Sequence, residues 1–120
     1  MKVLIVDDSK IARMGVIKSL KEIQPEAELF QATNGLEAVE LFKKEKPDVV
    51  FLDLTMPVMD GYEALKKIIE IDKEAQVIVV SADIQSEAKH RVLVAGAKNM
   101  YPKPINKEIM THIFEQDLLL

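Results

Sequence analysis

Acidic, hydroxyl and basic side chains follow four short segments of this chain, three of them apolar runs. Residues 3–6 precede Asp7 and Asp8, residues 49–52 precede Asp53, residues 77–80 precede Ser81, and a fourth, less regular segment precedes Lys103. A carboxylate acceptor, a magnesium ion, a hydroxyl and a lysine are the groups that phosphoryl transfer uses. We interpret Asp53, alone at its run's end, as the nucleophile, and Asp7 with Asp8 as metal ligands.

Three neighbouring carboxylates require positive charge among them. Two carboxylates about 4 Å apart repel by roughly 4 kcal/mol at an effective dielectric constant of about 20. A bound cation and Lys103 would supply that charge. The simpler alternative is that Asp7 and Asp8 cap the next helix. Asp53 and Lys103 at corresponding positions favour the metal site.

The elements that must bring these residues together are parallel strands. Strands buried on both faces are continuous apolar runs, and their carboxyl ends share one edge of the sheet. We expect strands over residues 3–6, 27–32, 49–52 and 77–80, with a fifth before Lys103. Helical spacing predicts helices from Asn34-Gly35 to Lys46-Pro47, over 62–71 and over 86–94. It also predicts helices after Ser9 and after Asn106, each capped by that residue. This alternation predicts a doubly wound α/β fold with a five-stranded parallel sheet.

Composition limits the class of protein. The 120 residues suit one domain spanning 1–120, with 48% hydrophobic and 30% charged residues. A net charge of −4 gives no basic surface for nucleic acid, and the apolar runs are too short for a membrane span. The absence of cysteine excludes disulfides and thiolate chemistry. We expect a cytoplasmic protein that binds neither nucleic acid nor membrane.

Four motifs together resemble the receiver domain of two-component response regulators. They are VDDS at 6–9, FLDLTMPVMDG at 51–61, SA at 81–82 and KP at 103–104. The resemblance covers essentially the whole chain and implies the flavodoxin-like (βα)5 receiver fold. It also implies a signalling protein that catalyses its own phosphorylation and dephosphorylation, rather than an enzyme with other substrates.

The resemblance assigns roles to the strand-end residues. Asp53 would accept a phosphoryl group from a phosphohistidine on a histidine kinase. Asp8, Asp53 and the backbone carbonyl of Thr55 would hold Mg²⁺, with Asp7 acting through metal-bound water. Ser81 and Lys103 would contact the phosphoryl group.

Further implications concern the loops around these residues. The peptide bond between Lys103 and Pro104 is expected to be cis. Thr55 and Asp83 lie where the family tunes the lifetime of the phosphorylated state.

The switch position departs from the family pattern. An aromatic residue usually stands three residues before the lysine, where this chain has Met100, and Tyr101 follows it. Alternation along a strand predicts that Tyr101 points to the other face. Ser81, Met100 and Tyr101 are therefore the candidate switch residues. The fourth helix, fifth strand and last helix would bind an output protein.

Asp8-Ser9 with Arg13 resembles the stand-alone chemotaxis regulators, and no output domain follows the last predicted helix. We expect Arg13 to be exposed. A monomer is expected, with a phosphorylation-dependent dimer as an alternative. A receiver domain cut from a larger regulator would have the same sequence features.

Two other functions share part of this residue set. Phosphatases of the haloacid-dehalogenase type also use a strand-end aspartate, but they carry an acid two residues later, where this chain has Thr55. An interaction module that takes no phosphate would not need Asp8, Asp53, Ser81 and Lys103.

Overall fold

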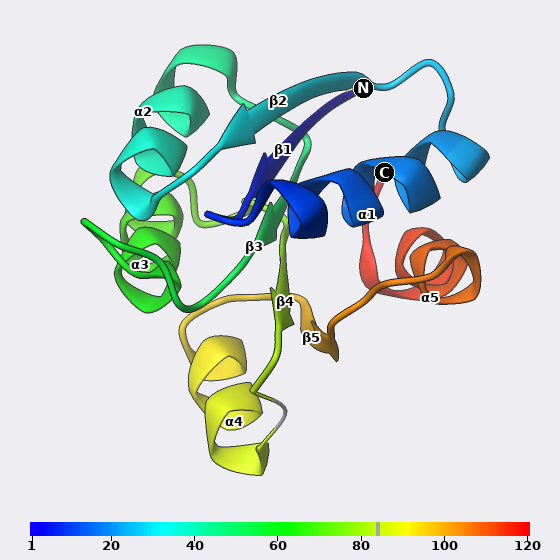
Figure 1. Ribbon diagram of the computed structural model, residues 1–120. Coiled ribbons are helices and arrows are strands. Elements are labelled where there is room, and N and C mark those ends of the chain that lie inside the picture. Colours follow the sequence, from blue (N-terminus) through cyan, green and yellow to red (C-terminus); the bar gives the residue numbers. More distant parts are fainter. Residues whose placement is uncertain (84) are drawn as a thin grey trace.

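The computed structural model describes residues 1–83 and 85–120, in which strands and helices alternate (Figure 1). The strands are β1 (Lys2–Val6), β2 (Glu28–Ala32), β3 (Val49–Leu52), β4 (Val77–Ser81) and β5 (Asn99–Pro102). The helices are α1 (Lys10–Ile23), α2 (Gly35–Glu45), α3 (Gly61–Ile71), α4 (Ser86–Val94) and α5 (Lys107–His112). A π-helical turn, Ile113–Asp117, continues α5 and was not predicted. The predicted order of elements is confirmed.

The described strands form one parallel sheet in the order β2-β1-β3-β4-β5. Every residue of β3 and β4 is buried, whereas the edge strands β2 and β5 mix buried, half-buried and exposed residues. Continuous apolar runs therefore became inner strands, as burial on both faces requires. The predicted doubly wound α/β fold is confirmed.

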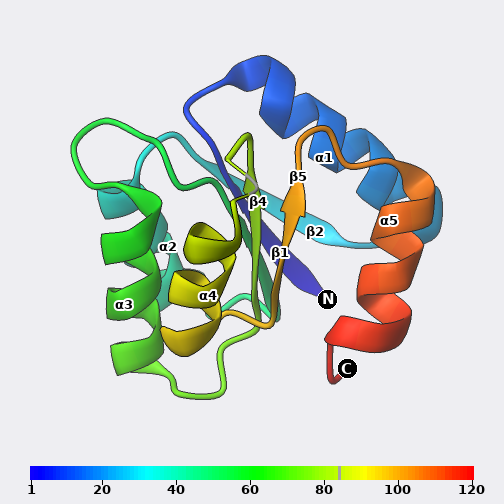
Figure 2. The same cartoon turned by 90° about the horizontal axis from the view of Figure 1, so that it is seen from below.

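Helices cover both faces of the sheet (Figures 1 and 2). On one face, α1 and α5 pack over a core that includes Leu20, Phe51 and Met110. On the other, α2, α3 and α4 pack over a core that includes Phe42 and Leu65. This arrangement leaves the carboxyl ends of the strands uncovered by helix, where loops carry the candidate site.

Helix starts are fixed by side-chain caps in four cases. Ser9, Asn34, Asp60 and Asn106 each accept a hydrogen bond from the backbone N–H three residues later, which confirms the caps predicted at Ser9 and Asn106. Gln85, at the start of α4, makes no such bond. A missing cap weakens the first turn of a helix. Within the described chain, no helix has the length and apolar character required to cross a membrane.

Candidate functional site

The ammonium group of Lys103 lies between two buried carboxylates. Its Nζ is 2.6 Å from Oδ2 of Asp7 and 3.1 Å from Oδ1 of Asp53. Asp7 follows β1, Asp53 follows β3 and Lys103 follows β5, so residues almost a hundred positions apart meet at the carboxyl edge of the sheet. The predicted meeting of these three side chains at one edge is observed.

Asp8 completes a group of three acidic side chains. Asp7, Asp8 and Asp53 each offer a carboxylate oxygen, and these oxygens lie within 4.8 Å of one another. Asp7 and Asp53 are each about 5% exposed, whereas Asp8 faces solvent. A few carboxylates with one open side suit Mg²⁺, which keeps several waters. The donor set therefore fits a magnesium ion.

Hydrogen bonds to the backbone hold Asp7 and Asp53 in place. The Asp7 N–H donates to the Ala32 carbonyl at 3.1 Å, and the Asp53 N–H donates to the Val6 carbonyl at 3.0 Å. Oδ1 of Asp7 accepts from the Ser9 N–H at 2.9 Å. Ser9 also caps α1, so the strand end and the helix start are tied together. Asp7 does not act as the helix cap.

Burial and mutual repulsion shape the charges of the site. Burial, followed by the Asp7 charge, raises the pKa of the Asp53 carboxyl, although Lys103 acts in the opposite direction. Burial lowers the pKa of Lys103, but its bonds and charge interactions with Asp7 and Asp53 outweigh this and raise it overall. Lys103 therefore stays charged, and further positive charge beside Asp53 would favour its ionised form.

Ser81 is connected to the lysine through the backbone. The Lys103 N–H donates to the Ser81 carbonyl at 3.1 Å, and the peptide bond between Lys103 and Pro104 is cis, as expected. Ser81 is 3% exposed, and its hydroxyl accepts from the Asp83 N–H at 3.0 Å. Because a hydroxyl both donates and accepts, this bond leaves the Ser81 proton available.

Thr55 and Asp83 lie in loops next to this group, and both are exposed. The Asp83 carboxylate accepts from the Gln85 N–H at 3.0 Å, so it organises the approach to α4. Thr55 stands two residues after Asp53 in the β3–α3 loop. Their assignment to phosphoryl lifetime stays a prediction.

Met100 and Tyr101 point to opposite faces of β5. Met100 is buried in the core beneath α2, α3 and α4. Tyr101 packs on the α5 side, where its hydroxyl donates to Asp117 and accepts from Asn99 at 3.1 Å. The structure confirms the predicted alternation; the switch role of either residue stays a prediction.

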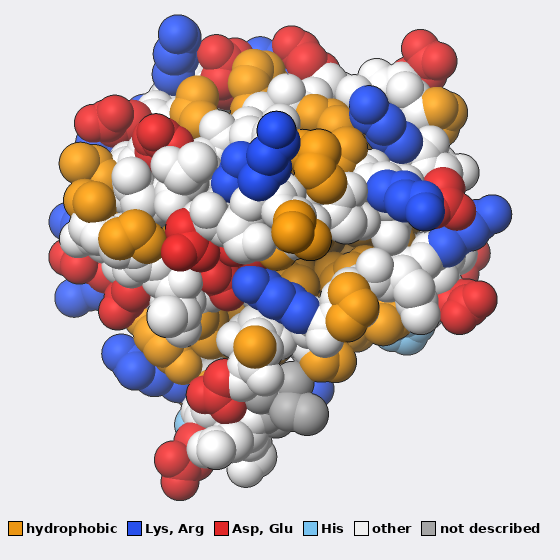
Figure 3. All heavy atoms as spheres, in the orientation of Figure 1, with side chains coloured by type: hydrophobic (Ala, Val, Ile, Leu, Met, Phe, Trp, Pro, Cys, Tyr) orange, Lys and Arg blue, Asp and Glu red, His pale blue; other side chains and the backbone are white. Residues whose placement is uncertain are grey.

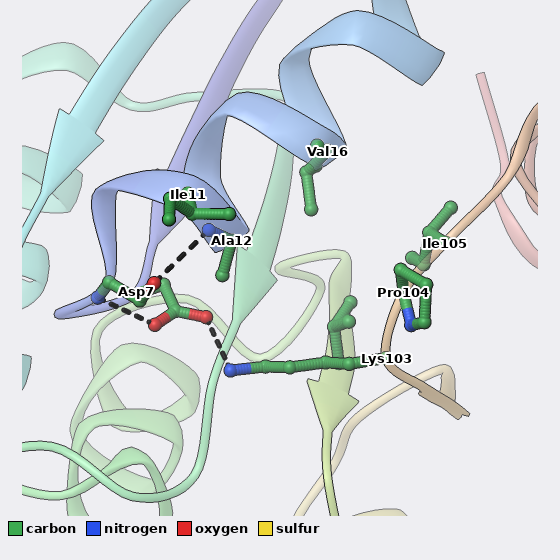
Figure 4. A pocket seen from close by; sticks show the side chains of 10 residues that line it. Asp7, Ile11, Ala12, Val16, Lys103, Pro104 and Ile105 are labelled. Atoms are coloured by element: carbon green, nitrogen blue, oxygen red, sulfur yellow. Dashed lines mark hydrogen bonds and ion pairs between the residues drawn. The ribbon is translucent and has the colours of Figure 1, made fainter.

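An apolar groove of about 440 Å³ opens beside Lys103 (Figure 4). Ile11, Ala12 and Val16 of α1 line one side, and Pro104 and Ile105 line the other. Figure 3 shows acidic and basic side chains next to an apolar hollow on this face. A quarter of the Lys103 side chain is exposed, so the side chain is partly open to solvent.

The sequence analysis missed two features of the site. Arg13, expected to be exposed, is half-buried, and its guanidinium group donates to the Asp7 carbonyl at 2.8 Å. Its place on the first turn of the helix after a reactive strand end was the available signal. Gly61, the last residue of the 51–61 motif, lies where a Cβ atom would come within 2.0 Å of the Asp53 carbonyl oxygen. Glycine is therefore required there.

Comparison with known proteins identifies the family. The family model for the response regulator receiver domain matches residues 3–115. The chain belongs to the response regulator receiver domain family. This receiver domain is 45% identical over 106 residues to the chemotaxis protein CheY of Thermotoga maritima, covering 86% of this chain and 85% of that protein. It is 40% identical to CheY of Bacillus subtilis over 111 residues, with coverage of 89% and 88%.

Solved structures give the same result for the fold. The crystal structure of the CheX–CheY–BeF3–Mg complex from Borrelia burgdorferi has a TM-score of 0.89 and 33% identity, covering 96% of this chain and 87% of that one. Vibrio cholerae CheY4 has a TM-score of 0.85 and 30% identity, covering 98% of both chains. The chain is a receiver domain of the chemotaxis CheY type, with the flavodoxin-like fold and a place in two-component signalling.

Proposed function

We propose that Asp53 accepts a phosphoryl group from the phosphohistidine of a histidine kinase, and that the phosphorylated chain binds an output protein in chemotaxis. The observation that carries this proposal is the position of the Lys103 ammonium group between Asp7 and Asp53, beside a three-carboxylate cluster. Nucleophile, counter-charge and metal ligands then act at one place.

The transfer itself forms one bond and breaks one. A carboxylate oxygen of Asp53 attacks the phosphorus atom, and the bond from phosphorus to the imidazole nitrogen breaks. The electron pair stays on that nitrogen, which becomes part of an ordinary histidine. Lys103, held 3.1 Å from Asp53, pairs with a phosphoryl oxygen. The Ser81 hydroxyl donates a hydrogen bond to another phosphoryl oxygen.

Asp7, Asp8, Asp53 and the Thr55 carbonyl would hold Mg²⁺ at this site. When bound, the ion neutralises charge on the transferring phosphoryl oxygens. Asp7 would act on the metal through water, because one of its oxygens pairs with Lys103 and the other accepts the Ser9 N–H.

We place the output surface on α4, β5 and α5. Of its described residues, α4 buries Ala88 and Val92, and it exposes Leu93 and Val94 at its carboxyl end. A weakly anchored helix with exposed apolar side chains can shift between two arrangements and offer contact area in one of them. We propose Ser81, Met100 and Tyr101 as the residues that couple this surface to Asp53, within a single monomeric domain in the cytoplasm.

Incubation with Mg²⁺ and acetyl phosphate, followed by intact-mass measurement, tests the proposal. The wild-type chain and Asp60→Asn should each gain one phosphoryl group, and Asp53→Asn should gain none. Asp60→Asn is a matched control, because Asp60 lies in the same loop and asparagine caps helices as well as aspartate does. An equal gain in Asp53→Asn, or no gain in the wild type, would contradict the proposal.

The lifetime assignment has its own test. Asp83→Ala and Thr55→Ala should each change the decay rate of phosphorylated Asp53, because both side chains lie in loops beside the site. The decay is followed by mass after removal of acetyl phosphate. Unchanged rates in both variants would exclude the assignment.

A further inference from the structure

Arg13 connects two strands at the edge of the carboxylate cluster. Its Nη1 donates to the backbone carbonyl of Asp7 at 2.8 Å, and its Nε donates to the side-chain oxygen of Gln31 at 2.9 Å. Asp7 ends β1, and Gln31 belongs to the neighbouring strand β2. We infer that Arg13 is a positioning residue that fixes the Asp7–Asp8 peptide and thereby holds Asp8 ready for Mg²⁺. This inference rests on the proposed metal site.

The need for such a residue comes from the end of the β1–β2 ladder. The paired register stops at Val6 and Ala32, and the last strand-like bond runs from the Asp7 N–H to Ala32. Beyond this point the chain turns at Asn34 into α2. The Asp7 carbonyl has passed the end of the ladder, and the Arg13 guanidinium group takes the place of the next strand donor.

The carbonyl of Asp7 belongs to the peptide unit that carries Asp8. Fixing that carbonyl fixes the peptide plane and with it the position of the Asp8 Cα atom, from which the Asp8 side chain leaves the backbone. The other three polar groups of Asp7 are also bonded, to Ala32, Ser9 and Lys103. Arg13 is therefore the contact that acts on the exposed neighbour, Asp8, whose own carboxylate faces solvent.

Arginine suits this place because of its shape. The planar guanidinium group donates in two fixed directions, toward Asp7 and toward Gln31. A lysine carries the same charge but holds a single donor group on a flexible stem. Arg13→Lys keeps the positive charge and removes the fixed geometry, so it separates the two effects of Arg13 on Mg²⁺ affinity. These effects have opposite signs. The positive charge repels the ion, and the fixed geometry favours it.

Isothermal titration calorimetry with Mg²⁺ on the unphosphorylated full chain tests the inference, at low and at high salt. Arg13→Lys should weaken Mg²⁺ binding roughly tenfold at both salt concentrations, as loss of an outer contact to a metal ligand does. Gln31→Ala, which keeps the charge and the Asp7 bond, should weaken binding by a smaller factor. Lys10→Gln, at an exposed position of α1, is the charge control. This variant should bind Mg²⁺ slightly more tightly than the wild type at low salt and equally well at high salt.

Thermal unfolding of each metal-free variant is measured alongside. An unchanged Mg²⁺ dissociation constant for Arg13→Lys, or a weakening that disappears at high salt, would overturn the positioning role. A lowered unfolding midpoint without a change in affinity would also overturn it, because Arg13 would then act on the fold alone. If the wild-type chain itself bound no Mg²⁺, the proposed function would fail instead.

Discussion

The ends of β1 and β3 and the β4–α4–β5 edge share one side of the sheet, but they are held in different ways. Asp7 and Asp53 follow inner strands, bond through their backbone to neighbouring strands, and are almost fully buried. β5 is an edge strand, and α4 starts without a side-chain cap. The centre, formed by the ends of β1 and β3, is thus fixed by backbone pairing and burial, whereas among the described residues of the edge region β5 pairs on one side alone and α4 lacks a side-chain cap.

Lys103 connects the two regions, so its removal has the largest expected effect. Lys103→Met leaves Asp7 and Asp53 facing each other without their shared cation, and we expect the free energy of unfolding to fall by about 3 kcal/mol in the absence of metal. Urea unfolding in a chelator measures this. Lys98→Met, at an exposed lysine before the other end of β5, should change the free energy of unfolding by less than about 0.5 kcal/mol. Equal stability of the two variants would show that the central charges are not coupled.

Whereas Lys103→Met lowers the free energy of unfolding, Asp53→Asn should raise it. It removes a carboxylate whose pKa is raised by burial and by Asp7, and we expect a gain of about 1–3 kcal/mol for the metal-free chain at neutral pH. The gain should shrink as the pH falls, because wild-type Asp53 takes up its proton in the folded state before the unfolded state does.

Glu40→Gln, on the exposed side of α2, is the acid-to-amide control and should leave stability nearly unchanged. If the difference in the free energy of unfolding between the wild type and Asp53→Asn did not depend on pH, the proposed repulsion between Asp7 and Asp53 would be contradicted.

Strain in the β3–α3 loop gives a smaller effect. Val58 has a φ of 68° and is 78% exposed, a conformation that costs a β-branched residue roughly 1–2 kcal/mol. Val58→Gly should therefore raise the free energy of unfolding by about 1 kcal/mol.

Val94→Gly is the matched control, because Val94 is 73% exposed but ends the α4 helix. The free energy of unfolding of Val94→Gly should be about 0.5–1 kcal/mol lower than that of the wild type. Both are measured by urea unfolding, and equal signs for the two glycine variants would exclude strain at Val58.

Much of the fold and of the site was predictable because two simple patterns coincide. Apolar runs identified the inner strands, and parallel strands place their following residues at one edge, so Asp7, Asp53 and Lys103 had to meet. Helix caps at Ser9 and Asn106 followed from residue type alone.

The remaining features depend on how elements end in space. The contact of Arg13 with Asp7 requires the β1–β2 ladder to stop at Ala32, and the strained Val58 lies in a loop whose Gly61 N–H bonds to Leu54. Asp117, which accepts the hydrogen bond of the Tyr101 hydroxyl, lies in a π-helical turn, and a helical period of 3.6 residues does not predict such a turn. These contacts are set by how the chain closes in three dimensions. For Arg13, its place on the first turn of α1 was a local signal, but it did not specify the Asp7 carbonyl as the partner.

Tyr101 gives the smallest effect and tests the edge region directly. Tyr101→Phe removes a hydroxyl that donates to Asp117 and accepts from Asn99, and we expect a loss of about 0.5–1 kcal/mol in the free energy of unfolding. Burial, followed by Asp117, raises the pKa of this hydroxyl above its ordinary value near 10. The hydroxyl's contribution is therefore complete below about pH 10 and is lost at higher pH, so the two proteins should converge there.

The same variant shows whether centre and edge are separable. Tyr101 packs on the α5 side of β5, away from Met100, and Tyr101→Phe keeps the aromatic ring on which the proposed coupling to Asp53 depends, so the rate of phosphorylation by acetyl phosphate should stay unchanged. Tyr62→Phe, on α3, keeps the ring that lies 3.7 Å from the Arg91 guanidinium group and serves as the control. A slower phosphorylation in Tyr101→Phe, with Tyr62→Phe unaffected, would mean that the Tyr101–Asp117 bond also orders the centre. In that case Lys103, which follows Tyr101 by two residues, would be the connection.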